Sequence, residues 1–445
     1  TTQIGVIGAT GGSPRILKSI DWRGAGKVLF SPDGRYLAFD PPMNDSRNTD
    51  VFVISADGSR ETHVVDNRAN DQVMGWTPDG SRLLFTSDRN GAKGLWALPM
   101  ADGKPLGLPE LIKAGVDGFP LGVTTCGTLY FALTAGDRDV RIGSIDFETG
   151  RQLAKPTAPL DSFVGMNQQA DWSPDGKSLI YVSGRDLVAG AARVLSIRSM
   201  ETGAVRELNV NLASYRWPRW APDGRSLLVY GKDLKGRQGI FRIDAQSGDA
   251  TTVVLDGADE GSVGPAWSPD GRRIYYRRFR TGAGYAFIER DLTSGSEREL
   301  YRRVRVGPPA VSPDGRYLAA MVPEPTKVST VLLIPVDGGE PKEIFRASDE
   351  PVGPIGNWMS WTPDGRFVLV SRLLNASGGS REVLAIPAAG GMAHGVEITL
   401  MDDYPVRVHP DGRQVAYVTG ELNFEVWALE HFLPARTTSR AAARK

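Results

Sequence analysis

The sequence has a single cysteine, Cys126, and four histidines in 445 residues. One cysteine excludes an intrachain disulfide and any zinc site built from several cysteines. Lys plus Arg (52) equals Asp plus Glu (52), so the formal net charge is zero. That balance argues against a protein that covers nucleic acid or acidic membranes, because such proteins need a basic excess. No run approaches the roughly 20 apolar residues that span a bilayer, and residues 1–20 lack the basic and apolar pattern of a signal peptide.

Glycine (52) and proline (30) are abundant, which favours a turn-rich all-β chain. The tripeptide Pro-Asp-Gly recurs eight times, with its aspartate at positions 33, 79, 175, 223, 270, 314, 364 and 411. Successive steps are 46, 96, 48, 47, 44, 50 and 47 residues. Because 96 is twice 48, the spacing predicts a hidden ninth unit near Gly127, where the glycine and the following apolar strand are kept and Pro-Asp is lost.

Each Pro-Asp-Gly predicts a tight turn between two antiparallel strands. Proline presets φ, aspartate bonds local backbone N–H groups, and glycine accepts the positive φ that reverses the chain. Every unit carries four short alternating segments, which predict a small four-stranded antiparallel sheet. One such sheet cannot bury both faces, so neighbouring sheets must stack around an axis. The sequence therefore predicts an all-β fold, a β-propeller of nine four-stranded blades.

The repeat also carries a family resemblance. Trp-Ser-Pro-Asp-Gly followed by an apolar strand, as at Trp172 and Trp267, with Gly-Gly-x-Pro before a later strand, resembles the TolB-type (WD-like) β-propeller repeat. The resemblance covers residues 11 to about 434. The ending 425–434 is similar to bacterial propellers fused to receptor Ser/Thr kinases or winged-helix regulators. These resemblances imply a sensor module of a bacterial signalling protein, with a periplasmic or extracytoplasmic location favoured.

The last unit, from Val406 to Leu429, has three strand candidates and lacks a fourth. Residues 13–18 read as the missing strand, which predicts a ring closed by the N-terminal strand. The alternative is eight blades plus an appendage. No linker separates domains, so the sequence predicts one propeller domain over residues 1–434 and a basic, disordered tail over 435–445.

Motifs for known chemistry are scarce. Some serine peptidases carry a similar propeller, but their catalytic domain needs Gly-x-Ser-x-Gly, which this sequence does not contain. The glycine-rich segment 5–11 resembles a phosphate loop but lacks a following helix, so it predicts a β-turn. The eight turn aspartates are interpreted as turn formers, not as a carboxylate array. The scattered histidines are His63, His394, His409 and His431, and we expect neither a metal nor a cofactor.

The sixth unit is rich in arginine, including Arg278, Arg280 and Arg302. Acidic residues in the same unit, such as Glu297 and Glu299, can neutralise them. An ion-paired blade rim is therefore expected, and a polyanion-binding patch is the alternative, which predicts binding that weakens steeply with salt.

The loops that enter the innermost strands surround the mouth of the central channel and are the predicted binding surface. They supply Asp71, Gln72, Asn167, Gln168, Arg216, Trp217, Asn357, Trp358, Asp403 and Tyr404. The alternative for Trp217 and Trp358 is packing between blades. We predict a non-catalytic, monomeric recognition module for a protein partner or a small polar ligand. The alternative is a lyase or hydrolase at the channel mouth, which predicts converging Asp, Glu, His or Arg groups with shifted pKa values.

Overall fold

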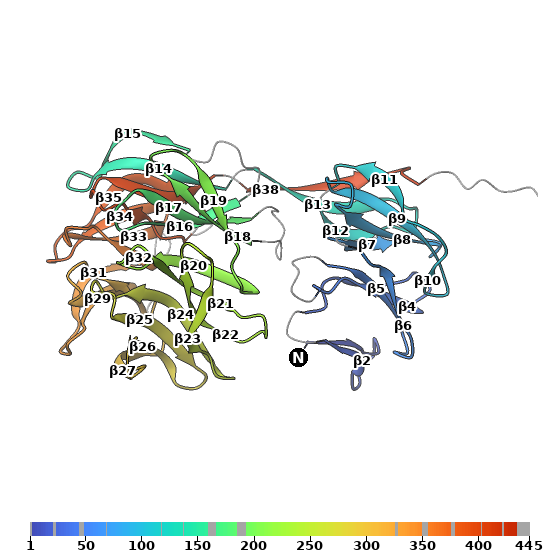
Figure 1. Cartoon of the computed structure of the whole chain (residues 1–445), viewed down its shortest axis with the longest axis horizontal. Helices are drawn as coiled ribbons and strands as arrows, with labels where there is room; N and C mark the ends of the chain where they lie inside the picture. Colours follow the sequence, from blue (N-terminus) through green and yellow to red (C-terminus); the bar gives the residue numbers. More distant parts are fainter. Residues whose placement is uncertain are drawn as a thin grey trace, which may run out of the picture. The chain divides into compact units, whose positions relative to one another are not determined.

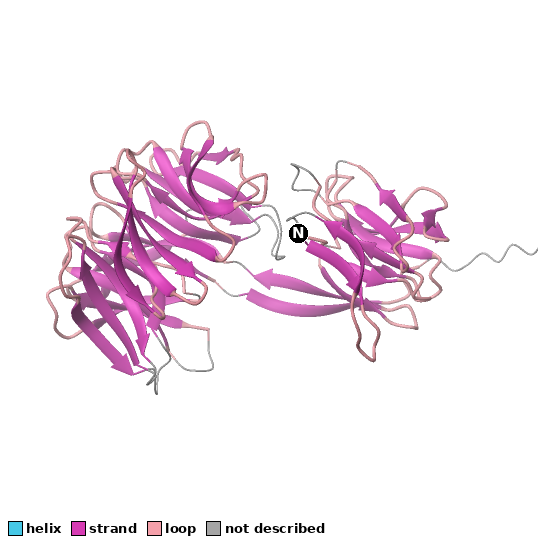
Figure 2. Ribbon diagram, turned by 90° about the horizontal axis from the view of Figure 1, so that it is seen from below, coloured by secondary structure: helices cyan, strands magenta, loops and turns pink. Residues whose placement is uncertain are grey.

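The computed structural model of the chain contains strands and loops and, in its described residues, no helix (Figure 2). It describes residues 2–20, 24–43, 49–67, 69–116, 118–136, 138–158, 166–184, 193–324, 328–348, 355–374, 379–401, 403–420 and 422–433. The chain divides into two compact units. Unit 1 comprises Thr1–Ala135 and Asn423–Lys445 with Val188–Gly190, and unit 2 comprises Gly136–Leu187 and Ala191–Leu422. Each unit is a set of small antiparallel sheets labelled in Figure 1.

Five sheets of unit 2 are each formed by four consecutive strands. Their strands are β16 (Met166–Trp172), β17 (Ser178–Gly184), β18 (Arg193–Ser199) and β19 (Val205–Leu208); β20 (Ser214–Trp220), β21 (Ser226–Lys232), β22 (Gln238–Asp244) and β23 (Ala250–Leu255); β24 (Glu260–Trp267), β25 (Arg273–Arg280), β26 (Gly284–Asp291) and β27 (Glu297–Arg303); β28 (Ala310–Val311), β29 (Tyr317–Glu324), β30 (Val328–Pro335) and β31 (Lys342–Ser348); and β32 (Ile355–Trp361), β33 (Phe367–Leu373), β34 (Arg381–Pro387) and β35 (His394–Leu400). The second strand of each sheet is buried over most of its length, as in β17 and β33, because each sheet is covered on both faces.

The sixth sheet of unit 2 is composite. Its order is β36 (Arg407–Val408), β37 (Gln414–Thr419), β14 (Asp139–Asp146) and β15 (Arg151–Thr157). Antiparallel pairing joins Asp139 to Thr419 and continues to Ser144 and Gln414. Two segments whose paired residues lie 270 to 280 positions apart in the chain thus complete one blade.

The six sheets of unit 2 form a closed ring. Their first strands contact one another in a cycle, β16, β20, β24, β28, β32, β36 and back to β16. A separate apolar core lies between each pair of neighbouring sheets, so six cores join six sheets. The core that closes the cycle packs Val140 and Val418 of the composite sheet against Trp172 and Tyr181 of the first. Unit 2 is therefore a six-bladed β-propeller, because every blade buries both faces against a neighbour.

Unit 1 contains four sheets in a row. They are formed by β1 (Thr2–Val6) and β2 (Arg15–Ile20); β3 (Val28–Phe30), β4 (Tyr36–Phe39), β5 (Val51–Ser55) and β6 (Glu61–Val65); β7 (Gln72–Trp76), β8 (Arg82–Ser87), β9 (Gly94–Ala101), β10 (Lys104–Pro105) and β11 (Glu110–Ala114); and β12 (Phe119–Val123), β13 (Leu129–Gly136) and β38 (Leu422–Leu429). Three cores join the four sheets in sequence. No core among the described residues connects the first sheet to the last, so unit 1 is an open stack.

The all-β propeller fold is confirmed, and so is the hidden unit near Gly127, which forms the turn between β12 and β13. The predicted closure is wrong. Residues 13–18 pair with β1, and the ring of unit 2 closes through β14 and β15 because these strands supply the free edge that β37 needs. Two units replace the single ring expected over residues 1–434, and neither nine blades nor eight plus an appendage is confirmed as one ring. The tail 435–445 lies outside the described residues.

Candidate functional site

The carboxylates of the turn aspartates accept hydrogen bonds within their own turns. All eight accept the backbone N–H two residues later, as Asp33 does from Arg35 at 3.0 Å. The serine before the turn also donates to the same carboxylate, and these hydrogen bonds lower the pKa of Asp33 below its usual range. His409 replaces that serine and accepts from the backbone of Asp411 at 3.0 Å. The array is therefore structural, as the sequence predicts.

The predicted mouth residues fall in both units. Asp71 and Gln72 belong to unit 1, where Asp71 is fully buried and pairs with Arg89 at 3.0 Å, so they are not part of the ring of unit 2. The other eight lie in unit 2. Asn167 is buried and its amide donates to Asp139 at 3.1 Å, which ties β16 to β14. Arg216 is exposed on β20, where it is the cross-strand neighbour of Tyr230.

The remaining six mouth residues come together in pairs from different blades of unit 2. The Tyr404 hydroxyl donates to Gln168 at 2.6 Å. The Asp403 carboxylate accepts the Asn357 backbone N–H at 2.8 Å. The rings of Trp217 and Trp358 lie 4.9 Å apart, tilted by 48°. Trp217 also adopts φ of +54°, an uncommon conformation for a residue with a side chain, and its N–H donates to Gln169 at 2.8 Å. The two tryptophans come from β20 and β32, whose sheets are not neighbours in the ring, so packing between adjacent blades does not account for their contact. Their role at the mouth stays a prediction.

The inner strands of unit 2 carry a second set of polar residues, which the sequence prediction did not include. Four positions before each turn aspartate, the inner strands of the six blades place the residues Asp171, Arg219, Ala266, Ala310, Ser360 and Arg407. The position is equivalent around the ring. The Trp172 indole donates to the Arg407 carbonyl, and the Trp267 indole makes the same bond to the Arg219 carbonyl of the blade before it. Four consecutive blades thus contribute a polar side chain at one level, and we call Asp171, Arg219, Ser360 and Arg407 the axial cluster.

Two guanidinium groups share one carboxylate in the axial cluster. Arg219 Nη1 lies 3.4 Å and Arg407 Nε 3.6 Å from Asp171 Oδ1. Asp171 Oδ2 accepts the backbone N–H of Trp220 at 2.9 Å, and Arg407 Nη1 donates to Ser360 Oγ at 3.0 Å. Arg407 Nε makes no hydrogen bond to the described residues and is buried. The side chains of Asp171 and Arg219 are 17% exposed and that of Arg407 is 9% exposed.

Burial shapes the charge of the axial cluster. Loss of hydration lowers the pKa of Arg407 well below its usual value, and the neighbouring Arg219 lowers it further, whereas Asp171 raises it. The pKa of Arg219 is also lowered by burial, against the opposing effect of Asp171. Perturbed groups that converge from several blades are typical of functional sites. The sequence contains a signal for these residues, because the position four residues before the turn aspartate is small in some repeats and charged in others.

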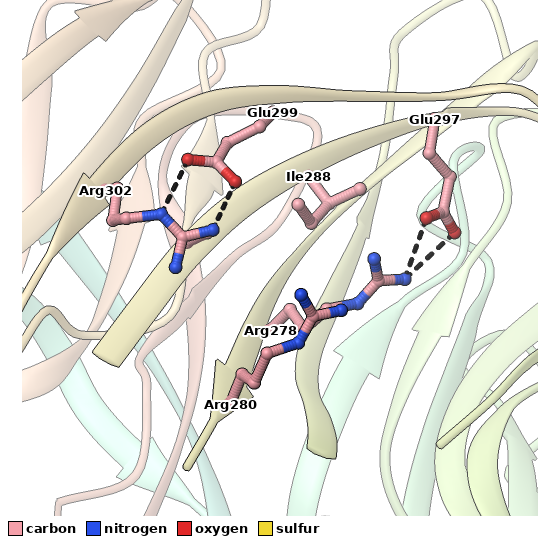
Figure 3. Close-up of a pocket in the computed structure, with 7 residues that line it drawn as sticks. Arg278, Arg280, Ile288, Glu297, Glu299 and Arg302 are labelled. Atoms are coloured by element: carbon pink, nitrogen blue, oxygen red, sulfur yellow. Dashed lines mark hydrogen bonds and ion pairs between the residues drawn. The ribbon is translucent and has the colours of Figure 1, made fainter. Parts of the chain in front are cut away.

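The arginine-rich blade is neutralised internally in part. Arg278 lies 2.9 Å from Glu297 and Arg298 lies 3.1 Å from Glu289, and Arg302 pairs with Glu299. Figure 3 shows the pairs Arg278–Glu297 and Arg302–Glu299 on the wall of a shallow pocket between β25 and β27. Four arginines of this unit form no ion pair within the described residues, namely Arg272, Arg277, Arg303 and Arg305. A polyanion-binding patch therefore stays a prediction.

Unit 1 has one group of potential metal ligands among the described residues, Asp50, His63 and Asp66. His63 Nε2 lies 3.0 Å from the buried Asp50 carboxylate and Nδ1 lies 3.7 Å from Asp66. The two carboxylates thus face opposite nitrogens of one imidazole, whose ring stacks on Phe52. One cation cannot bind both nitrogens, so the geometry fits a structural carboxylate–histidine pair better than a metal centre.

No family model matches the chain. The chain is similar to dipeptidyl-peptidase 5 of Porphyromonas gingivalis, with 23% identity over 303 residues, which cover 56% of this chain and 44% of that protein. It is also similar to the uncharacterized peptidase YuxL of Bacillus subtilis, with 30% identity over 148 residues, which cover 33% of this chain and 20% of that protein. The chain thus matches less than half of the length of these two relatives.

Among solved structures, a putative TolB from Agrobacterium tumefaciens matches with a TM-score of 0.51 and 20% identity, covering 64% of this chain and 99% of that one. This likeness supports the TolB-type propeller fold. Nothing in the comparisons supports the resemblance to propellers fused to kinases or winged-helix regulators. The described residues also include no helix long and apolar enough to cross a membrane.

The predicted function needs correction. The sequence predicts a non-catalytic recognition module, yet two curated relatives are named as peptidases, which contradicts that prediction. The prediction failed because it relied on the missing serine motif and on the small number of histidines. The alternative, an enzyme site at the channel mouth, expected converging groups with shifted pKa values, and in the axial cluster two arginines with lowered pKa values converge on Asp171.

Proposed function

We propose that the protein is a hydrolase-type enzyme that acts on peptide-like substrates, with its substrate site at the axis of the six-bladed ring of unit 2. The observation that carries this proposal is the axial cluster, in which four consecutive blades direct polar side chains to one level. The names of the relatives favour a hydrolase over the lyase alternative.

The cluster offers fixed N–H donors in a water-poor site, which can bind a polar group of a substrate and hold it in one orientation. Arg219 and Arg407 supply these donors, and Asp171 holds the Arg219 guanidinium in place at 3.4 Å. The Gln168–Tyr404 pair and the two tryptophans at the mouth supply polar and aromatic contacts for the rest of a peptide.

A panel of N-acetylated tripeptides tests the proposal, because every cleavage then releases the only free amine. We expect amine release by the purified chain, and a kcat/KM that falls at least about tenfold in Arg219→Gln, since a charge-assisted hydrogen bond contributes about 1.5–3 kcal/mol.

Arg302→Gln is the matched control, because Arg302 lies in the same unit but pairs with Glu299 on β27. Its rate should equal that of the unchanged chain. A folded chain that cleaves none of the peptides, or an Arg219→Gln variant with full activity, would contradict the proposal. A protein partner and a monomeric state remain predictions, which size-exclusion chromatography with light scattering can check.

A further inference from the structure

The axial cluster carries one positive charge more than it carries negative charge. Arg219 and Arg407 face Asp171, and no second carboxylate among the described residues lies within ion-pair distance of Arg407. An uncompensated charge in a buried site costs several kcal/mol. A site built this way is completed when an anion enters it.

The axial cluster also contains a hydrogen-bond donor that has no acceptor among the described residues. Asp171 spends one oxygen on the backbone N–H of Trp220, and its other oxygen is 3.4 Å and 3.6 Å from the two arginines. The buried Nε of Arg407 donates to nothing among the described residues. A buried donor without an acceptor is costly, so this atom requires a partner that the neighbouring residues do not provide.

The two remaining blades carry small residues at the equivalent position. Ala266 and Ala310 are both buried, and their methyl groups bring neither a charge nor a hydrogen-bond acceptor. The side chains of these two blades therefore do not supply the acceptor that Arg407 Nε lacks.

We propose that the axial cluster binds the carboxylate of the substrate, between Arg219 and Arg407, so that the enzyme acts on peptides or similar molecules with a free acid group. This inference rests on the proposed function for the identity of the substrate. The excess of a single positive charge matches a monoanion, whereas a phosphate dianion would leave a buried negative charge. Planar guanidinium groups also suit the two oxygens of a carboxylate.

Calorimetric titration with two probes tests the inference, N-acetyl-trialanine and its C-terminal amide, which differ only in the acid group. We expect the acid to bind at least about tenfold more tightly than the amide. Arg219→Gln should remove that preference, and Arg302→Gln should keep it. Asp171→Asn retains an acceptor for the Trp220 N–H but removes the competing charge, so it should bind the acid at least threefold more tightly.

Equal binding of acid and amide would overturn the inference, and so would a tighter complex with inorganic phosphate than with the acid. A merely structural role for Asp171 would lower affinity in Asp171→Asn and not raise it. If Asp171→Asn does not fold, the comparison of Arg219→Gln with Arg302→Gln still decides. Acid-selective binding without peptide cleavage would reject the proposed function alone, and cleavage without acid selectivity would reject the carboxylate site alone.

Discussion

Unit 1 and unit 2 are built from the same repeat, but they differ in how the two apolar faces of each sheet are covered. In unit 2 six cores join six sheets, so no blade has an uncovered face. In unit 1 three cores join four sheets, and apolar side chains of the last sheet are exposed within that unit, among them Leu121, Val426 and Trp427. The repeat therefore determines the blade, while the pairing of β14 with β37 determines closure.

Truncating one core aromatic in each unit tests whether the units unfold separately. Phe241 of unit 2 and Phe85 of unit 1 are both fully buried, and replacing either with alanine should cost about 3–5 kcal/mol. We expect each variant to lower hydrogen-exchange protection in its own unit, measured peptide by peptide. Equal loss of protection in both units from either variant would show a single cooperative structure.

A buried carboxyl should give unit 1 its own pH dependence. Asp40 is 4% exposed and accepts the N–H groups of Val73 and Lys27, and burial raises its pKa to about 7. The folded state therefore holds the proton more tightly than the unfolded chain. This stabilisation is fully present below about pH 4 and is lost as pH rises through 7, by at most about 4 kcal/mol.

Urea unfolding of unit 1 at pH 5 and pH 7.5 measures that dependence. Asp40→Asn, which cannot ionise, should flatten it, and the protection of unit 2 should change little between the two pH values. A variant that keeps the full pH dependence would place its origin elsewhere.

The smallest expected difference concerns two tryptophans at the same place in the repeat. Trp172 and Trp76 are both 6% exposed, but only the Trp172 indole has an acceptor, the Arg407 carbonyl at 3.1 Å. Trp172→Phe should therefore cost about 1 kcal/mol more than Trp76→Phe, the net contribution of one hydrogen bond. Equal losses in chemical denaturation would mean that the indole bond contributes nothing to joining the blades.

The sequence predicts the local structure well, because its strongest signals are local. Pro-Asp-Gly specifies a turn through the positive φ of its glycine, as at Gly176 with +70°, and the alternating segments specify the strands. Closure could not be predicted this way. The partner of β37, which is β14, lies far away in the chain. No residue of β14 or of the segment 13–18 indicates which of these two segments pairs with β37.

The candidate site was predicted only in part for the same reason. Gln168, Trp217, Trp358 and Tyr404 could be named from the sequence because they precede a recognisable turn motif, and the structure brings them into contact in pairs. Arg219 and Arg407 were missed because their meaning comes from Asp171, which is distant in sequence and adjacent only once the ring has formed. A comparison of the six repeats at that one position would have identified them.

The composite blade has a consequence for biosynthesis. Since Asp139 pairs with Thr419, the nascent chain cannot complete the ring of unit 2 until Thr419 has left the ribosome. The edge of β14 that later pairs with β37 stays unpaired during that time, and unpaired strand edges invite aggregation. We therefore expect chaperones to protect the incomplete ring of unit 2 during synthesis. The yield of folded protein should then depend more on chaperone capacity during translation than on the stability of the folded protein.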